Sequence, residues 1–259
     1  MSGLLFDPDI AACAQLVDRA DPDRFAATLA TPVAVRGILF PLYAFNVEVA
    51  RAPWVTTEPM IAEMRLQWWA DALEEIATGA AVRRHEVVTP LAAVLDVDAA
   101  RDLAALVEAR RWDIYTDPFE DQAQFTEYLA ATTGRLLWVA ARLLGAPATD
   151  QEGVAQVSGA IALANWFRAI PELEARGRMP LPDGRPETVA ALAGEALRAL
   201  SGQNRLGKPA RQVLLSGWRA RHALRQAQRD PMSVAEGRLQ ESEFRRRLTL
   251  LKSTLTGRI

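Results

Sequence analysis

The stretch LYAFNVEVARAPW, residues 42–54, carries two charged side chains at helical spacing. Glu48 and Arg51 lie three positions apart, so on a helix they share one face, about one turn from each other. The pair is either a polar binding site or an ion pair that stabilises the helix, and the second is the commoner outcome. Both interpretations require a helix through this stretch.

Three acids of the segment DALEEI are also spaced as metal ligands are on a helix. Asp71, Glu74 and Glu75 follow one another at i, i+3 and i+4, which places their side chains on neighbouring positions of one face. Acids at this spacing are, however, typical of the solvated side of an amphipathic helix. We therefore interpret the three as a solvated face.

A third polar group, Asn165, Arg168 and Glu172, lies in the segment ALANWFRAIPELEARGRMPLP. The planar guanidinium of an arginine suits phosphate or carboxylate groups, so Asn165 and Arg168 are either ligand contacts or a hydrogen-bonded internal pair. Pro171 lacks an N–H and disfavours helical backbone at Ile170, which predicts that the helix ends or kinks before Glu172.

The composition limits the classes of ligand. The chain has 259 residues, a net charge of −2 and a pI near 5.8, so it has no general attraction for nucleic acid or for anionic lipid. A single cysteine, Cys13, excludes an intramolecular disulfide. His85 and His222 are far apart in the sequence, and no zinc-type ligand cluster is expected.

The two ends of the sequence bear on location. The segment MSGLLFDPDIAACAQ has neither a basic start nor a long apolar core, so no secretory signal or transit peptide is expected. No run approaches about 18 uncharged apolar residues, and no membrane span is expected. The segment FRRRLTLLK, residues 244–252, is basic and partly amphipathic. It is either a solvated charged face, the commoner outcome, or a contact for a membrane or an acidic partner.

Strand signals are nearly absent, and the pattern predicts an all-α protein with a single domain over residues 1–259. In the helix expected over 57–78, Thr57 is a candidate N-cap and Gly79 a stop. Of Trp68 and Trp69, one is expected in the core and the other against a neighbouring helix. The residues expected to form the buried stripe of this helix are Ile61, Met64, Trp68, Leu73 and Ile76. Helices are predicted over 9–19, 22–29, 32–52, 57–78, 87–95, 98–114, 122–144, 150–170, 187–202, 207–228 and 240–256.

Four separated stretches resemble, in order, the squalene and phytoene synthase family of head-to-head prenyl synthases. They are PLYAFNVEVARAPW, RLQWWADALEEIATG, YLAATTGRLLWVAARLLG and ALANWFRAIPELEARGRMPLP. The resemblance implies an isoprenoid-synthase-type helical bundle, a single domain around a central cavity. Active members hold magnesium-bound diphosphate between two aspartate-rich motifs on facing helices.

Both motifs lack their acids in this sequence. By the resemblance, the acids of the first fall on Ala50, Arg51 and Trp54, and those of the second on Ala169 and Leu173. Metal neutralisation of a departing phosphate is worth several kcal/mol, so ionisation of a prenyl diphosphate is expected to be slower by orders of magnitude. We therefore expect no catalytic residue, no metal ligand and no cofactor, with magnesium relevant only to an active prenyltransferase.

The stretch AFNVEVARAPWVTTEPMIAEMRLQWWADALEEI is most similar to the non-catalytic branch typified by mitochondrial complex I assembly factor 6. That resemblance implies an assembly or accessory role, with subunits or assembly intermediates of respiratory complex I as partners. Two alternatives stay open: an active prenyltransferase making squalene- or phytoene-type products, and a carrier that binds an isoprenoid or other lipid in the cavity. We expect a bacterial protein of the cytoplasm or peripheral on the cytoplasmic face of the inner membrane.

The resemblance also places a set of candidate ligand-binding side chains on the cavity side of the helices. For the tyrosines among them, an ordinary core position is the competing interpretation. The candidates are Tyr43, Asn46, Glu48, Arg51, Tyr128, Asn165, Arg168 and Glu172.

Overall fold

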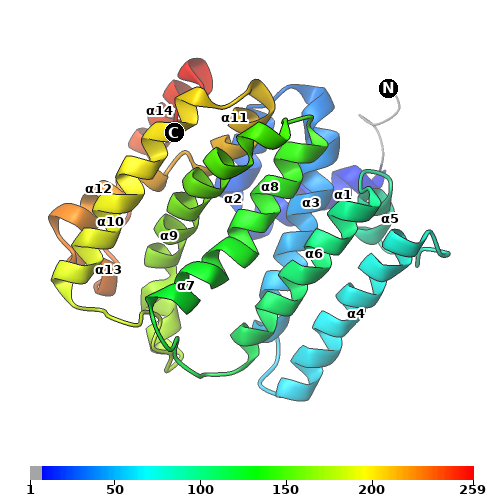
Figure 1. Cartoon of the computed structure of the whole chain (residues 1–259), viewed down its shortest axis with the longest axis horizontal. Helices are drawn as coiled ribbons and strands as arrows, with labels where there is room; N and C mark the ends of the chain where they lie inside the picture. The colour runs from blue at the N-terminus through cyan, green and yellow to red at the C-terminus, as the bar shows by residue number, and fades with distance from the viewer. Residues whose placement is uncertain (1–7) are drawn as a thin grey trace. The chain divides into compact units, whose positions relative to one another are not determined.

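The computed structural model describes residues 8–259, and every regular element in that range is a helix (Figure 1), which confirms the all-α prediction. The chain divides into two compact units. Unit 1 contains the residues up to Tyr115 together with Trp138–Ala146, and unit 2 contains Thr116–Leu137 and Pro147–Ile259. The single domain expected over residues 1–259 stays a prediction, and residues 1–7 lie outside the described part of the chain.

Unit 1 is built around the apolar helix α3, which packs against α1 and α2, while α4 runs alongside α6 (Figure 1). Leu39 and Phe45 of α3 and Leu103 of α6 are almost fully buried. The elements are α1 Pro8–Ala20, α2 Pro22–Leu29, α3 Val33–Arg51, η2 Ala52–Trp54, α4 Pro59–Thr78, α5 Val88–Ala92, α6 Val97–Ala109, η3 Arg110–Ile114 and most of α8 Arg135–Leu143.

The segment Val33–Trp54, which joins α3 and η2, is long and apolar enough to cross a membrane by length and composition, with a mean hydropathy of 1.4. A core helix of a water-soluble domain meets the same two criteria, and 56% of this apolar window is buried inside the protein. The packing of α3 against α1, α2 and α5 is that of a core helix.

The buried face of α4 differs from the predicted one. Ile61 and Met64 are 45% and 66% exposed, whereas Leu66 and Trp69 are buried. The buried residues are Ala62, Leu66, Trp69, Ala72 and Leu73, so the contact stripe is rotated by about one position from the expected stripe.

The predicted C-terminal end of α4 is confirmed, whereas its predicted N-cap is wrong. Pro59 occupies the first turn, and Gly79 ends the helix with a left-handed φ of 69°. Thr57 is not the N-cap, because that position is taken by Glu58, whose N–H donates to Thr56 Oγ1 at 3.1 Å. The N-cap therefore lies one residue later than expected, and it makes no side-chain capping hydrogen bond.

Unit 2 is organised by the long helix α9, which packs against α10, α12 and η4. Gly217 approaches Ile161 of α9 so closely that a Cβ at Gly217 would overlap its side chain, which explains a glycine there. The elements are α7 Gln122–Leu129, the π-helical turn η4 Ala130–Gly134, η5 Ala148–Asp150, α9 Gln151–Ala175, α10 Pro186–Leu200, η6 Ser201–Arg205, α11 Lys208–Leu214, η7 Leu215–Gly217, α12 Ala220–Arg229, α13 Met232–Ala235 and α14 Glu243–Thr256.

Helix α9 continues through Pro171, so the predicted end before Glu172 is wrong, and a kink, the other predicted outcome, stays a prediction. A proline removes one backbone donor, but Ile170 and Leu173 on either side are 2% and 9% exposed, and their burial holds the helical path. The helix expected over 207–228 is instead broken into α11, η7 and α12, and the short helix α13 was not predicted.

Candidate functional site

The candidate residues of unit 1 divide into one ion pair and two core side chains. Arg51 Nη2 lies 2.7 Å from Glu48 Oε1, with the arginine side chain half exposed and the glutamate side chain 14% exposed. This is the geometry of an i,i+3 helix pair. Helix α3 ends at Arg51, and Pro53 follows in the 3-10 turn η2.

Tyr43 and Asn46 lie one helical turn apart in the buried part of α3. Tyr43 is 1% exposed, and the guanidinium of Arg24 lies 4.9 Å from the centre of its ring. This contact is a cation–π arrangement that stabilises unit 1. The core interpretation of Tyr43 is therefore the one that its surroundings support.

Tyr128 of unit 2 is also a core side chain. Its ring packs against Phe119 and Trp166 with centroid separations of 5.5 and 5.4 Å, and Phe125 completes the cluster. Trp166 Nε1 donates to the main-chain oxygen of Pro180 at 2.8 Å. The cluster thereby fixes the segment that follows α9.

The polar candidates on α9 are exposed. Glu172 is engaged by Arg176, whose Nη2 lies 2.6 Å from Glu172 Oε1, as expected of an i,i+4 pair on a helix surface. Asn165 and Arg168 are both exposed. The two residues are therefore not a buried internal pair. Of the three, Arg168 alone lines one of the cavities of unit 2.

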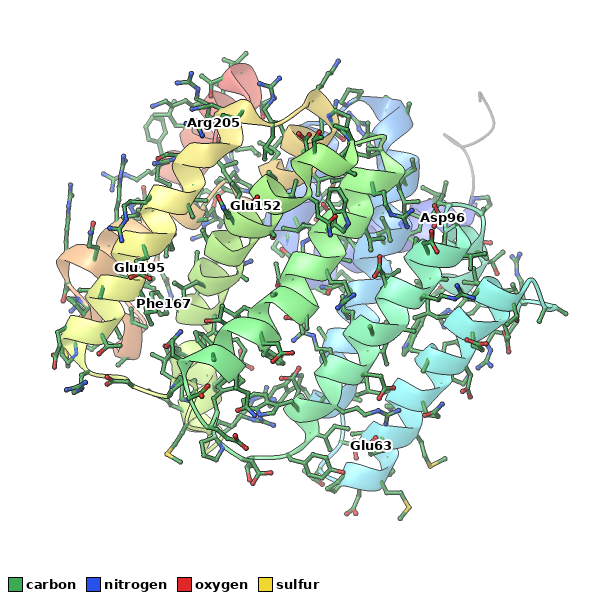
Figure 2. All side chains as sticks on the ribbon, viewed as in Figure 1. Glu63, Asp96, Glu152, Phe167, Glu195 and Arg205 are labelled. Atoms are coloured by element: carbon green, nitrogen blue, oxygen red, sulfur yellow. The ribbon has the colours of Figure 1, made fainter. Side chains whose placement is uncertain are left out.

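That cavity, named here the arginine pocket, has a volume of about 310 Å³. Its charged lining consists of three arginines and one glutamate, and Arg219 and Arg246 are engaged by Glu241 and Glu243. Guanidinium groups are suited to phosphate or carboxylate. Phe167, labelled on α9 in Figure 2, belongs to its apolar wall. The lining residues are Phe167, Arg168, Arg219, Val234, Gly237, Leu239, Gln240, Glu241 and Arg246.

The most buried charge of the arginine pocket is Glu241, whose side chain is 1% exposed. Arg219 Nε donates to Glu241 Oε2 at 3.1 Å, and His222 Nδ1 lies 3.6 Å from Glu241 Oε1. Burial lowers the pKa of the His222 imidazole, and the charge of Glu241 acts in the opposite direction. The lowered pKa favours the neutral imidazole, and Arg219 supplies the countercharge of Glu241.

The acids of α4 form a surface rather than a metal site. Asp71 and Glu74 are exposed, and Glu75 is held by Arg83 through hydrogen bonds that lower the pKa of its carboxyl. Within residues 8–259, no group of three or more His, Cys, Asp or Glu side chains is placed to hold a metal ion. Trp69 is the core tryptophan, whereas Trp68 packs against the loop residue His85.

Comparison with known proteins identifies the class. The sequence pattern of the squalene/phytoene synthase family matches residues 17–243. The protein belongs to this family. In the solved structures, a dehydrosqualene synthase superposes with a TM-score of 0.79 at 17% identity, over 96% of this chain and 95% of its own. A squalene synthase from Alicyclobacillus acidocaldarius gives a TM-score of 0.71 at 16% identity, over 86% and 94%. The fold is therefore of the isoprenoid-synthase type, as predicted.

Among characterised proteins, the chain is similar to relatives named for respiratory complex I. The complex I assembly factor 6 homologue of Drosophila melanogaster is 29% identical over 61% of this chain and 50% of its own length. The human complex I assembly factor 6 is 25% identical over 66% and 52%. The chain spans about half the length of these relatives. The predicted resemblance to the squalene/phytoene synthase family, and to its assembly-factor members, is confirmed.

The arginine pocket itself was not predicted. Arg168 was singled out, but Arg219, Gln240 and Glu241 come from later segments that show no motif. Their meeting depends on the turn at Gly237, which has a φ of 67° and packs on the Pro171 ring. The only local signal was this glycine, two residues after a short apolar run. It predicts a turn but does not indicate which residues the turn contacts.

Proposed function

We propose that this protein is a non-catalytic member of the squalene/phytoene synthase family that acts by binding, as an assembly or accessory factor for respiratory complex I. The observation that carries the proposal is the similarity to complex I assembly factor 6 proteins, which extends over about three fifths of the chain. The partners are then subunits or assembly intermediates of the complex, encountered in the cytoplasm or at the cytoplasmic face of the inner membrane of a bacterium.

The side chains at the positions of the family's metal motifs support a role without catalysis. Arg51 presents a cation, paired with Glu48, where an acid would be required. Leu173 is 9% exposed and belongs to the apolar packing of α9. Glu172, the acid that lies between the motif positions 169 and 173, is already paired with Arg176. No magnesium or other cofactor is needed for this proposed role.

The test is deletion of the gene in the organism that encodes it. Complex I amount on native gels and NADH:quinone activity of the membranes are expected to fall several-fold, with succinate:quinone activity unchanged as the control. Expression of the wild-type chain should restore both. A tagged chain should also retain complex I subunits in a pull-down, compared with an unrelated tagged protein. Unchanged complex I amount and activity after deletion would contradict the proposal.

The arginine pocket favours a second candidate function, the binding of a lipid or isoprenoid with an anionic head group. Its cationic lining suits such a head group, and the volume of about 310 Å³ accommodates a small one. Native mass spectrometry of the purified chain is expected to detect a bound lipid, and substitution of the exposed Arg168 by alanine should weaken its retention. A protein that is free of lipid under the same conditions argues against the carrier.

A further inference from the structure

Helix α14 exposes a continuous apolar stripe. Phe244, Leu248, Leu251 and Leu255 are 78%, 54%, 56% and 78% exposed, respectively. Their spacing of four, three and four residues places all four side chains on one face of the helix, within an arc of about 60°. Scattered exposed apolar residues are ordinary, but four on one helix face are typical of an interaction site.

The face of α14 that packs on unit 2 is largely polar. Ser253 is 4% exposed, and Arg246 and Thr249 are partly buried on the same side, with Leu250 beside them. Arg246 lines the arginine pocket. A surface helix of a globular domain normally turns its apolar stripe inward. Helix α14 has the reverse orientation, because mostly polar side chains point to the protein, whereas Leu248, Leu251 and Leu255 point to the outside.

This orientation is held by contacts on both sides of the helix. Before α14, Glu241 is fixed by Arg219 at 3.1 Å. After it, the main-chain N–H of Ile259 donates to Gln203 Oε1, and its main-chain oxygen accepts from Gln203 Nε2 and Arg221 Nε at 3.0 and 2.9 Å. Rotation of the helix to bury the leucines would break these contacts.

The charges around the stripe are cationic. The segment 243–258 contains five basic side chains and one acid, a net charge of +4, whereas the whole chain carries −2. At about 100° per residue, Arg247 flanks one edge of the stripe and Arg245 and Lys252 flank the other. The single acid, Glu243, is paired with Arg246 and Arg247. The stripe is therefore an apolar band between two cationic edges.

We infer that α14 docks on the surface of an anionic lipid bilayer. The apolar band enters the boundary between head groups and acyl chains, and the arginines and lysine at its edges meet the phosphates. A second copy of the chain fits less well, because two stripes in contact would bring two segments of charge +4 together. The inference does not depend on the proposed role in complex I assembly.

Vesicle flotation tests the inference with the full chain and two kinds of vesicle, phosphatidylcholine alone and phosphatidylcholine with about a third phosphatidylglycerol. We expect binding to the anionic vesicles at least tenfold stronger than to the neutral ones, and a marked decrease at high salt. Each basic residue near a membrane surface contributes about fivefold in affinity. The triple variant Arg245→Gln, Arg247→Gln, Lys252→Gln should therefore bind roughly a hundredfold more weakly.

The apolar contribution is tested by Leu251→Glu, which should reduce binding at least tenfold because a charge enters the band. Met60→Glu, at a 75% exposed apolar position of α4, is the matched control and should bind as the wild type does. Arg65→Gln with Arg84→Gln and Arg101→Gln, all exposed residues of unit 1, is the charge control. Circular dichroism checks that each variant keeps its helical content.

Three results would overturn the inference. The first is an absence of binding to anionic vesicles at low salt. The second is binding that survives Leu251→Glu but is lost with the charges, because that is adsorption without docking of the band. The third is a concentration-dependent dimer in a protein that binds neither kind of vesicle. Light scattering would detect this dimer, and Leu251→Glu would remove it.

Discussion

Asp96 is a single carboxylate with two structural tasks in unit 1. It lies at the start of α6 (Figure 2), where its Oδ1 accepts from the N–H of Ala99 at 2.7 Å. The same carboxylate accepts two hydrogen bonds from the Arg142 guanidinium, at 2.9 and 3.0 Å. The hydrogen bonds from Arg142 lower the pKa of Asp96, and the N-cap bond adds to the effect.

This pKa sets the direction of a pH dependence. A carboxyl whose pKa is lower in the folded state adds stability above its unfolded pKa of about 3.9, and the contribution is lost as the pH falls through the folded value. The variant Asp96→Asn keeps the cap and loses the charge. We expect its free energy of unfolding at pH 7 to be lower than that of the wild type by less than about 1 kcal/mol, because the pair is partly exposed.

Urea denaturation from pH 7 to pH 3 measures this difference, which should shrink below a pH of about 4. Arg142→Gln is the matched control, and the double variant should lose little more than either single one. Asp96→Ala, which also removes the cap, should lose about 1 kcal/mol more. A difference between wild type and Asp96→Asn that stays constant down to pH 3 would show that Asp96 does not titrate in this way.

At the scale of elements, α4 has two apolar faces of which one is buried. Leu66 and Trp69 face the protein, and the ring of Trp69 lies 5.5 Å from that of Phe45 in an edge-to-face contact. Met60 and Met64 are exposed. Because α4 packs alongside α6, the position of α6 determines which face is covered.

Substitutions on the two faces of α4 are therefore expected to differ in cost. Leu66→Ala should lower the free energy of unfolding by about 2–5 kcal/mol, since it leaves a cavity at a fully buried position. Met64→Ala should change it by less than about 0.5 kcal/mol, because the side chain is 66% exposed. Denaturation midpoints in urea measure the two losses of stability. Equal losses for Leu66→Ala and Met64→Ala would show that the exposed face of α4 is covered in solution.

The same helix shows where sequence reasoning succeeds and where it stops. Pro59 and Gly79 mark the ends of α4 because their effects on the backbone are local. The choice between the stripe through Met64 and the stripe through Leu66 is not local, since both have helical periodicity. The burial of Glu241 is even harder to predict from the sequence, because it depends on Arg219, which is 22 residues earlier in the chain. The Glu48–Arg51 pair could be predicted since its two members are one turn apart.

At the scale of the whole molecule, the chain keeps the family's fold, and it has no acid at positions 50, 51, 54, 169 and 173, where the resemblance places the metal-binding acids. The fold similarity to a dehydrosqualene synthase extends over 96% of the chain. At the positions where the family's acids are expected, the chain has an exposed arginine at 51 and a buried leucine at 173. Although the whole chain carries −2, its segment 243–258, which includes α14, carries +4.

This distribution leads to a prediction about catalysis. With magnesium and farnesyl or geranylgeranyl diphosphate, the purified chain should form C30 or C40 product at least about a thousandfold more slowly than an active family member. The reason is that neutralisation of the leaving diphosphate by metal is worth several kcal/mol, and each 1.36 kcal/mol corresponds to about tenfold in rate. Release of labelled diphosphate, scored together with product, is the measurement, and a dehydrosqualene synthase assayed in parallel is the positive control.

The result of this assay tests whether a chain with the family's fold also has the family's catalytic activity. If the chain turned over prenyl diphosphates at a rate near that of the control, a non-catalytic role would be wrong, and Glu48 and Glu172 would be the first residues to substitute in search of a metal site. The same result would leave the docking of α14 untouched, because vesicle binding uses side chains on the outer face of that helix. If turnover is absent while anionic vesicles are bound, the protein is a member of a prenyl synthase family that works as a binding protein at a membrane.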